Sequence, residues 1–236
     1  MAGRTFLVSG GSGDIGAAVC RRLAALGYEP VVGFARSSET AARTAAACGG
    51  MALELDLSSP QSIAAALAAL EHGPSELRGV VLAASPPPRI GPFGKISADE
   101  MAVQWTVNVA GPQQLLAGLV RQHFRRARRG TVIGILSEAM GDASKPAMAG
   151  MGAYIIAKHG MAGMLGVLAA EHPWLRVGTV SPGFTDTRML RAFDERFLEL
   201  QRGRAAFRQA DDVAAEIATT IERFESETGD ERSVAS

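Results

Sequence analysis

Ser9-Gly10-Gly11-Ser12-Gly13-Asp14-Ile15-Gly16 follows an apolar run at residues 5–8 and precedes a helical pattern of apolar side chains. The order is therefore strand, glycine-rich turn, helix. Within it, Gly11-x-Gly13-x-x-Gly16 matches the dinucleotide-binding fingerprint. Glycines there let the backbone turn tightly and approach a pyrophosphate, whose charge lies at the positive end of the following helix. The stretch predicts the first unit of a nucleotide-binding fold, and a flexible glycine turn is the simpler alternative.

Further apolar runs alternate with helical patterns along the rest of the chain. We expect strands at residues 5–9, 31–34, 51–54, 80–83, 131–136 and 177–181. Such continuous apolar runs suit parallel strands that are covered on both faces. No linker, repeat or low-complexity segment divides the 236 residues. We therefore expect one α/β domain over residues 1–236, a Rossmann-type doubly wound parallel sheet with helices on both faces.

Two helices and the chain end carry further expectations. Ser97 and Glu100 have the capping-box spacing and predict a long helix over residues 98–124. Near the end, an apolar stripe predicts a helix over residues 213–224. The polar residues 225–236 are expected to form a tail or a degenerate last strand.

Composition and charge limit the classes of function that we expect. Lys and Arg number 24, and so do Asp and Glu, so no net field favours nucleic acid or an anionic membrane. Cys20 and Cys48 have no metal-ligand spacing and read as cytosolic thiols. No long apolar segment follows basic residues at the N-terminus. We expect a cytoplasmic protein without a metal site or a membrane span.

Several side chains that could take part in catalysis or binding fall at strand ends or on one helix face. Tyr154 and Lys158 are four residues apart, so on a helix they share a face. Ser137 follows one buried run, and Pro182-Gly183 follows another, ahead of two threonines. Ligands of open parallel sheets bind at the carboxyl ends of the strands. These groups are therefore expected to meet at one edge, although the Tyr-Lys pair could also be a surface helix pair.

The glycine turn, Ser137, Tyr154-x-x-x-Lys158 and Pro182-Gly183 together resemble the short-chain dehydrogenase/reductase family, over about residues 5–224. The resemblance implies that Tyr154 donates a proton, Ser137 holds the substrate oxygen and Lys158 binds the nicotinamide ribose. It also implies that Asn108 completes a water-linked proton relay. A free tyrosine has a pKa of about 10. The Lys158 ammonium is expected to lower the Tyr154 pKa by favouring the phenolate.

The end of the second strand bears on cofactor choice. An acidic residue there would favour NAD, but the chain has Arg36-Ser37 instead. Arg36 can grip a 2′-phosphate bidentately and Ser37 can add a hydroxyl, so we expect NADP(H) rather than NAD(H); a solvated arginine is the alternative. The expected cofactor-binding residues are Ser9, Gly11, Ser12, Gly13, Asp14, Ile15, Gly16, Arg36, Ser37, Asp56, Leu57, Ala83, Ala84, Tyr154, Lys158, Pro182, Gly183, Thr185 and Thr187.

The chain departs from the usual family pattern at several places, two of which lie near the expected nucleotide site. Asp14 stands where the family usually has Gly, and Leu82-Ala83-Ala84-Ser85 replaces an Asn-Asn-Ala-Gly. The glycine doublet and this segment are similar to polyketide synthase ketoreductase domains. We expect NADPH-dependent reduction of a ketone, such as a 3-oxoacyl thioester or a polyketide-like substrate. The alternatives are an NAD-dependent dehydrogenase of a sugar or secondary alcohol, and a nucleotide-binding subunit without turnover.

Partners are indicated by two surface patterns. An arginine cluster at the end of the long helix comprises Arg121, Arg125, Arg126, Arg128 and Arg129. It can simply complement the helix C-terminus, or it can attract an acidic acyl carrier protein and hold its acyl chain at the Ser137/Tyr154 edge. The resemblance also implies a homodimer or homotetramer through residues 98–124 and 152–170. Small residues at 160–166 permit close approach there, or serve packing within one chain.

Overall fold

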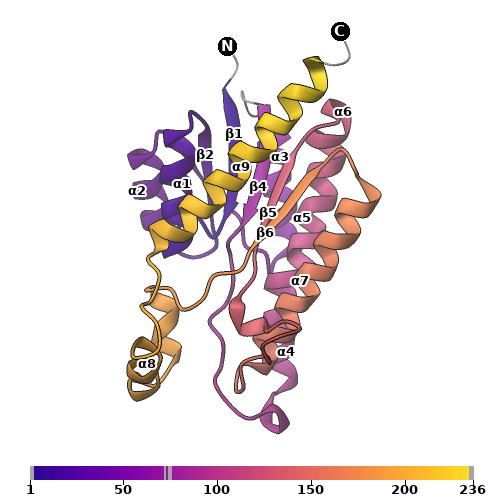
Figure 1. Ribbon diagram of the computed structural model, residues 1–236. Helices are drawn as coiled ribbons and strands as arrows, with labels where there is room; N and C mark the ends of the chain where they lie inside the picture. The colour runs from indigo at the N-terminus through magenta and orange to yellow at the C-terminus, as the bar shows by residue number, and fades with distance from the viewer. Residues whose placement is uncertain (1–2, 72, 74–75, 234–236) are drawn as a thin grey trace.

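A parallel sheet of six strands forms the centre of the computed structural model, which describes residues 3–71, 73 and 76–233 (Figure 1). The strands are β1 (Arg4–Ser9), β2 (Glu29–Phe34), β3 (Met51–Glu54), β4 (Glu76–Leu82), β5 (Thr131–Ile135) and β6 (Arg176–Val180). Their order across the sheet is β3-β2-β1-β4-β5-β6. The predicted doubly wound fold is confirmed. The strands β2 and β4 begin earlier than predicted, because their first residues interrupt the apolar pattern.

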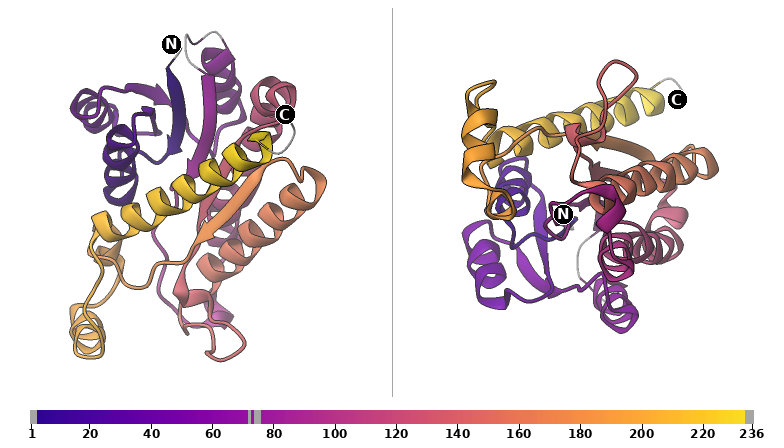
Figure 2. Two further views of the ribbon diagram at one scale, coloured as in Figure 1. Left: turned by 45° about the horizontal axis from the view of Figure 1, so that its top comes forward. Right: turned by 90° about the horizontal axis from the view of Figure 1, so that it is seen from below.

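Helices cover both faces of the sheet, as Figure 2 shows. One face is packed by α1 (Asp14–Ala25), α2 (Ser38–Ala47) and α9 (Ala210–Ser233). The other is packed by α3 (Pro60–Glu71), α5 (Gly111–Leu119) and α7 (Gly152–Glu171). Successive residues of β1 alternate between the two cores, with Phe6 and Val8 in one and Leu7 in the other. This double burial explains why the strand sequences are apolar without alternation.

The long helix predicted over residues 98–124 is present but irregular. It comprises α4 (Ala98–Trp105), a π-helical segment at Thr106–Ala110, α5, a second π-helical segment at Val120–Phe124 and α6 (Arg125–Ala127). The Ser97 hydroxyl accepts a hydrogen bond from the Glu100 amide at 3.1 Å and so caps it as predicted. Pro112 has no amide N–H to donate to the Asn108 carbonyl, a physical reason for the helix to widen there.

The end of the chain differs from the prediction. Residues 225–233 belong to α9 and form neither a tail nor a degenerate strand; residues 234–236 lie outside the described part. The Glu225 carboxylate binds Arg78 of β4 at 2.8 Å and Arg129, just before β5, at 2.6 Å. Arg78 is only 6% exposed, so this network holds α9 against the sheet at the amino ends of these strands. Among these polar residues, Glu225 thus pairs with the buried Arg78 and the half-buried Arg129 from its place on the helix.

Among the described residues, α7 is the one helix long and apolar enough to cross a membrane by length and composition. The same test is passed by core helices of soluble proteins. Met161 and Leu165 of α7 are buried in the core beside the sheet, and α7 also carries a buried lysine. The helix is therefore accounted for by its place in the fold.

Candidate active site

The glycine-rich turn joins β1 to α1 at the carboxyl edge of the sheet. Gly10 has φ +66°, and a Cβ there would lie 2.7 Å from the Ala84 Cα. A Cβ at Gly16 would collide with the Gly10 carbonyl oxygen. The backbone is therefore packed too closely for side chains, and the first amides of α1 have no partners within the helix. This arrangement fits a pyrophosphate at the helix N-terminus.

The loop after β4 lies directly beside this turn. The Ala83 amide donates to the Ser9 carbonyl oxygen at 3.2 Å, and the Ala84 amide donates to the Ser9 hydroxyl at 3.3 Å. Ser9 is fully buried. A serine hydroxyl thus tethers this loop, whose sequence departs from the usual family pattern.

Ser137, Tyr154 and Lys158 come together beyond the end of β5. Tyr154 and Lys158 lie on the buried face of α7, and their residues are 7% and 2% exposed. The Lys158 Nζ lies 5.5 Å from the Tyr154 ring centroid and donates to the Ile135 carbonyl oxygen at 2.8 Å. The Tyr154 side chain forms a hydrogen bond with the Ser137 side chain. The three groups predicted to meet therefore do so.

Burial dominates the acid-base properties of this cluster. It lowers the Lys158 pKa from 10.5 to about 7, because the ammonium is removed from water. It raises the Tyr154 pKa, and the hydrogen bond with Ser137 offsets part of this rise. The Tyr154 pKa is therefore raised in the protein, and the expectation that Lys158 lowers it is wrong. Desolvation is the largest cause of the rise, and the hydrogen bond with Ser137 is the one effect that lowers this pKa.

Asn108 lies in the first π-helical segment and is fully buried. Its Nδ2 donates to the carbonyl oxygen and to the Oε1 of Gln104, both at 3.0 Å. Its Oδ1 finds no hydrogen-bond partner within the described part of the chain. Gln104 in turn donates to the Pro87 carbonyl oxygen at 3.0 Å. Sequence reasoning missed Gln104, although its i, i+4 spacing from Asn108 was visible.

The residues predicted to bind the adenosine end follow β2 and β3. Arg36 is exposed and has no hydrogen bond or ion pair with any described residue. Ser37 stands at the N-cap of α2, and its hydroxyl makes no capping bond. The Asp56 carboxylate accepts from the amide and hydroxyl of Ser58 at 2.8 and 2.6 Å. The Leu57 side chain is buried in the core, so only its backbone is available to a ligand.

The segment after β6 begins next to Ser137 and Glu138 and extends to the glycine turn. The Glu138 amide donates to the Pro182 carbonyl oxygen at 3.0 Å, which holds Pro182-Gly183 beside the cluster. The Thr185 hydroxyl donates to the Gly183 carbonyl oxygen at 3.0 Å, and Thr187 donates to Thr185 at 3.3 Å. The chain then enters a 3₁₀ turn at Arg188–Ala192, which contacts Asp14. This last contact was not predicted.

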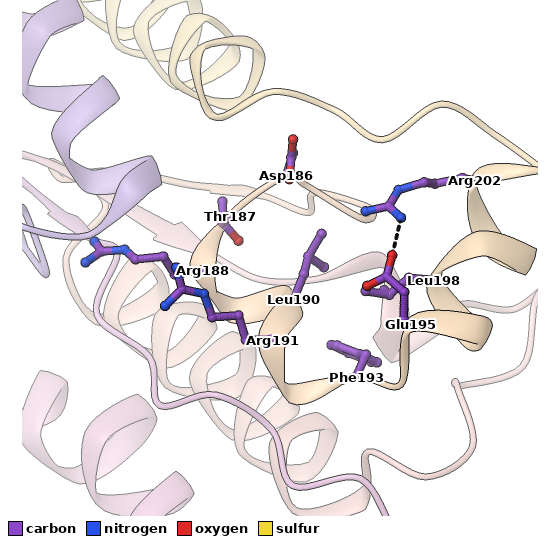
Figure 3. Close-up of a pocket in the computed structure, with 9 residues that line it drawn as sticks. All are labelled: Asp186, Thr187, Arg188, Leu190, Arg191, Phe193, Glu195, Leu198 and Arg202. Carbon is purple, nitrogen blue, oxygen red and sulfur yellow. Dashed lines mark hydrogen bonds and ion pairs between the residues drawn. The ribbon is translucent and has the colours of Figure 1, made fainter.

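A hollow of about 530 Å³ lies between that 3₁₀ turn and α8 (Glu195–Arg202) (Figure 3). The Arg202 guanidinium closes one side through an ion pair with Glu195 at 2.8 Å. Phe193 lines the hollow and also belongs to a group of contacting aromatic rings with Phe184 and Phe197. The hollow therefore combines charged and aromatic side chains, and Arg188 of its lining contacts Asp14 at the glycine turn.

The arginine cluster lies at the other end of the sheet. Its residues precede β5, whereas Ser137 follows β5, as the separation of α6 from α4 in Figure 1 illustrates. The Arg129 guanidinium is bound by Glu225, and Arg128 lies over the Trp174 ring at 5.8 Å from its centroid. A carrier protein bound at this cluster would therefore have to extend its acyl chain along the length of β5 to reach Ser137 and Tyr154, and its binding there stays a prediction.

Comparisons with known proteins agree on one family. The family model described as short chain dehydrogenase matches residues 4–196. A 3-oxoacyl-[acyl-carrier-protein] reductase of Pseudomonas aeruginosa is 34% identical, over 82% of this chain and 78% of that protein. A 2,5-dichloro-2,5-cyclohexadiene-1,4-diol dehydrogenase of Sphingobium indicum is 28% identical, over 82% and 78%. The crystal structure of a short chain dehydrogenase from Burkholderia cenocepacia in complex with NADP is similar, with a TM-score of 0.80 at 28% identity, covering 92% and 89%.

Proposed function

The chain belongs to the short-chain dehydrogenase family, and we propose that it reduces a ketone with NADPH. As a member of that family it is an oxidoreductase that acts on CH–OH or ketone groups with a nicotinamide nucleotide. The observation that carries this proposal is the convergence of Ser137, Tyr154 and Lys158 at the carboxyl edge of the sheet, where the glycine turn also lies. Bound NADPH would supply the hydride. The proton must then come from the protein.

The cluster offers a route for that proton. The hydrogen bond between Ser137 and Tyr154 lets both side chains point at one carbonyl oxygen. Ser137 holds and polarises that oxygen, and the Tyr154 phenol donates its proton as the alkoxide develops. Lys158 lies within reach of the ring and favours the resulting phenolate when it is protonated. One hydride and one proton convert the ketone to a secondary alcohol.

The preference for NADPH rests on Arg36. Arg36→Ala should weaken NADPH binding by on the order of 1.5–3 kcal/mol, because a charge-assisted bond to the 2′-phosphate is lost. NADH lacks that phosphate and serves as the control ligand, so its affinity should not change. Dissociation constants of both nucleotides, measured by calorimetry for both proteins, check this. Equal losses, or a wild-type preference for NADH, would rule out the assignment.

We propose a 3-oxoacyl thioester or polyketide-like ketone as the substrate. Support comes from the 34% identical 3-oxoacyl reductase and from the aromatic side chains beside the hollow. A β-ketoester assayed with each nucleotide tests the alternatives. NADPH-dependent reduction supports the proposal, whereas oxidation of sugars or secondary alcohols with NAD supports a dehydrogenase. Nucleotide binding without turnover on either set supports a non-catalytic subunit. Comparison of free and carrier-bound β-ketothioesters tests an acyl carrier protein partner.

We propose that the protein is a homodimer or homotetramer in the cytoplasm that assembles through residues 98–124, which begin with α4, and residues 152–170 of α7. Val103 and Trp105 of α4 are 53% and 44% exposed, and Val167 of α7 is 58% exposed. A Cβ at Gly163 would meet nothing within 4 Å, whereas one at Gly160 would lie 2.8 Å from the Trp105 ring. The small residues thus serve both packing within the chain and an open face.

The expected assembly can be tested by light scattering at micromolar concentration. The wild type should be at least a dimer, and Val167→Arg should give a monomer, because it places charge in the apolar face. Leu200→Arg is the matched control, since Leu200 is equally exposed at 58% but lies on α8. A monomeric wild type would refute the proposed assembly.

A further inference from the structure

Arg188 joins two parts of the site that are 174 positions apart in sequence. Its amide donates to the Asp14 Oδ2 at 2.7 Å, and its Nε donates to the Asp14 Oδ1 at 2.9 Å. Its Nη2 donates to the Ser12 carbonyl oxygen at 3.0 Å. The guanidinium therefore lies across the glycine turn, and in Figure 3 the side chain extends away from the hollow.

Asp14 occupies an unfavourable place for a carboxylate in a nucleotide site. It is the first residue of α1, where the backbone amides and the helix dipole favour a bound anion. A negative side chain there would repel a pyrophosphate bound to the same amides. The Asp14–Arg188 ion pair cancels that charge. The two side chains are 33% and 49% exposed, so the pair adds little to fold stability.

We propose that Arg188, held beside the glycine turn by Asp14, is a further cofactor-binding residue, and that its guanidinium donates its remaining N–H groups to the cofactor pyrophosphate. A guanidinium carries five N–H groups, and Asp14 and Ser12 accept from two of its three nitrogens. The inference rests on the proposed use of NADPH. It adds a basic residue from the segment after β6 to the nucleotide site.

The arrangement predicts that the two residues are energetically coupled in nucleotide binding. Removal of the Arg188 side chain deletes the phosphate contacts and also leaves the Asp14 charge unopposed. Its backbone bond to Asp14 remains, so the segment stays attached. Asp14→Asn removes the charge but keeps an acceptor for that amide. The double variant should therefore bind nucleotide better than Arg188→Ala alone.

The test is a double-mutant cycle read by calorimetric titration of NADPH and NADH at fixed ionic strength. Arg188→Ala should weaken both nucleotides by the same factor, roughly 10-fold or more, because both carry the pyrophosphate. Asp14→Asn should stay within about threefold of wild type, and the double variant should recover only the part of the loss due to the Asp14 charge, so that it still binds more weakly than Asp14→Asn. Arg191→Ala is the matched control, since Arg191 lies on the same 3₁₀ turn and has no ion pair with the described residues.

Three results would overturn the inference alone: unchanged affinity in Arg188→Ala, equal losses in Arg188→Ala and Arg191→Ala, or a double variant that binds nucleotide as tightly as Asp14→Asn. A loss confined to NADPH would also overturn it, because that would place Arg188 at the 2′-phosphate. A wild type that binds neither nucleotide overturns the proposed function together with this inference. Thermal unfolding of all variants establishes that each is folded.

Discussion

Tyr154→Phe is expected to bind NADPH with near-native affinity and to reduce ketones roughly 10²–10⁴-fold more slowly. The variant loses only the hydroxyl that supplies the proton. Its ring remains packed with Met151 and Ile155, so the fold should not change. Single-turnover and steady-state rates, together with the dissociation constant of NADPH, separate the chemical step from binding.

The sequence provides a matched control for this variant. Tyr28 is the only other tyrosine and is also 7% exposed, but it precedes β2 at the opposite edge of the sheet. Tyr28→Phe should turn over at the wild-type rate. Near-native turnover by nucleotide-bound Tyr154→Phe, or an equal loss in Tyr28→Phe, would contradict the role proposed for Tyr154.

The fold could be predicted because its elements have strong local patterns. Runs such as residues 131–136 are apolar without alternation, and parallel strands are buried on both faces. The secondary structure at the end of the chain was harder to predict, because it depends on contacts with residues distant in sequence. Glu225 reads as an exposed polar residue until its bonds to Arg78 and Arg129 are seen. Likewise, β4 begins at Glu76 because that network permits Arg78 to be buried.

The site was predictable where spacing alone determines geometry. A Tyr and a Lys four residues apart on one helix must share a face, and Ser137 must follow its strand at the carboxyl edge. The sequence could not show that burial would lower the Lys158 pKa. The place of the arginine cluster, by contrast, is visible in the sequence, because the cluster precedes the run at residues 131–136 and Ser137 follows it. The Asp14–Arg188 contact has no local signal, since it joins separate loops.

Lys158→Met is expected to lose turnover by at least about 10²-fold and to bind NADPH more weakly, yet to be more stable than wild type at pH 6. Lys158 is 2% exposed, and burial lowers its pKa to about 7. Below that pH the fold must hold a desolvated ammonium whose one hydrogen bond within the described part of the chain goes to the Ile135 carbonyl oxygen. Methionine has a similar length and carries no charge, so it removes this cost.

The pH dependence gives this prediction its sign. The native Lys158 pKa is about 7 and the unfolded value is 10.5. Between these values the unfolded chain binds a proton that the native lysine does not. This group therefore makes the free energy of unfolding rise with pH, by up to about 1.4 kcal/mol per pH unit. Lys158→Met lacks that contribution, so its stability advantage should be largest below pH 7 and should shrink toward pH 9.

Denaturant unfolding of both proteins at pH 6, 7, 8 and 9, without added nucleotide, measures the difference directly. Lys145→Met is the control, because Lys145 is exposed in the loop before α7 and should leave the pH dependence unchanged. Parallel pH profiles for wild type and Lys158→Met would mean that the native lysine keeps its ordinary pKa. Wild-type turnover by Lys158→Met would reject its place in catalysis. A variant that is more stable at pH 6 but inactive would mean that Lys158 is kept for chemistry at the expense of the fold.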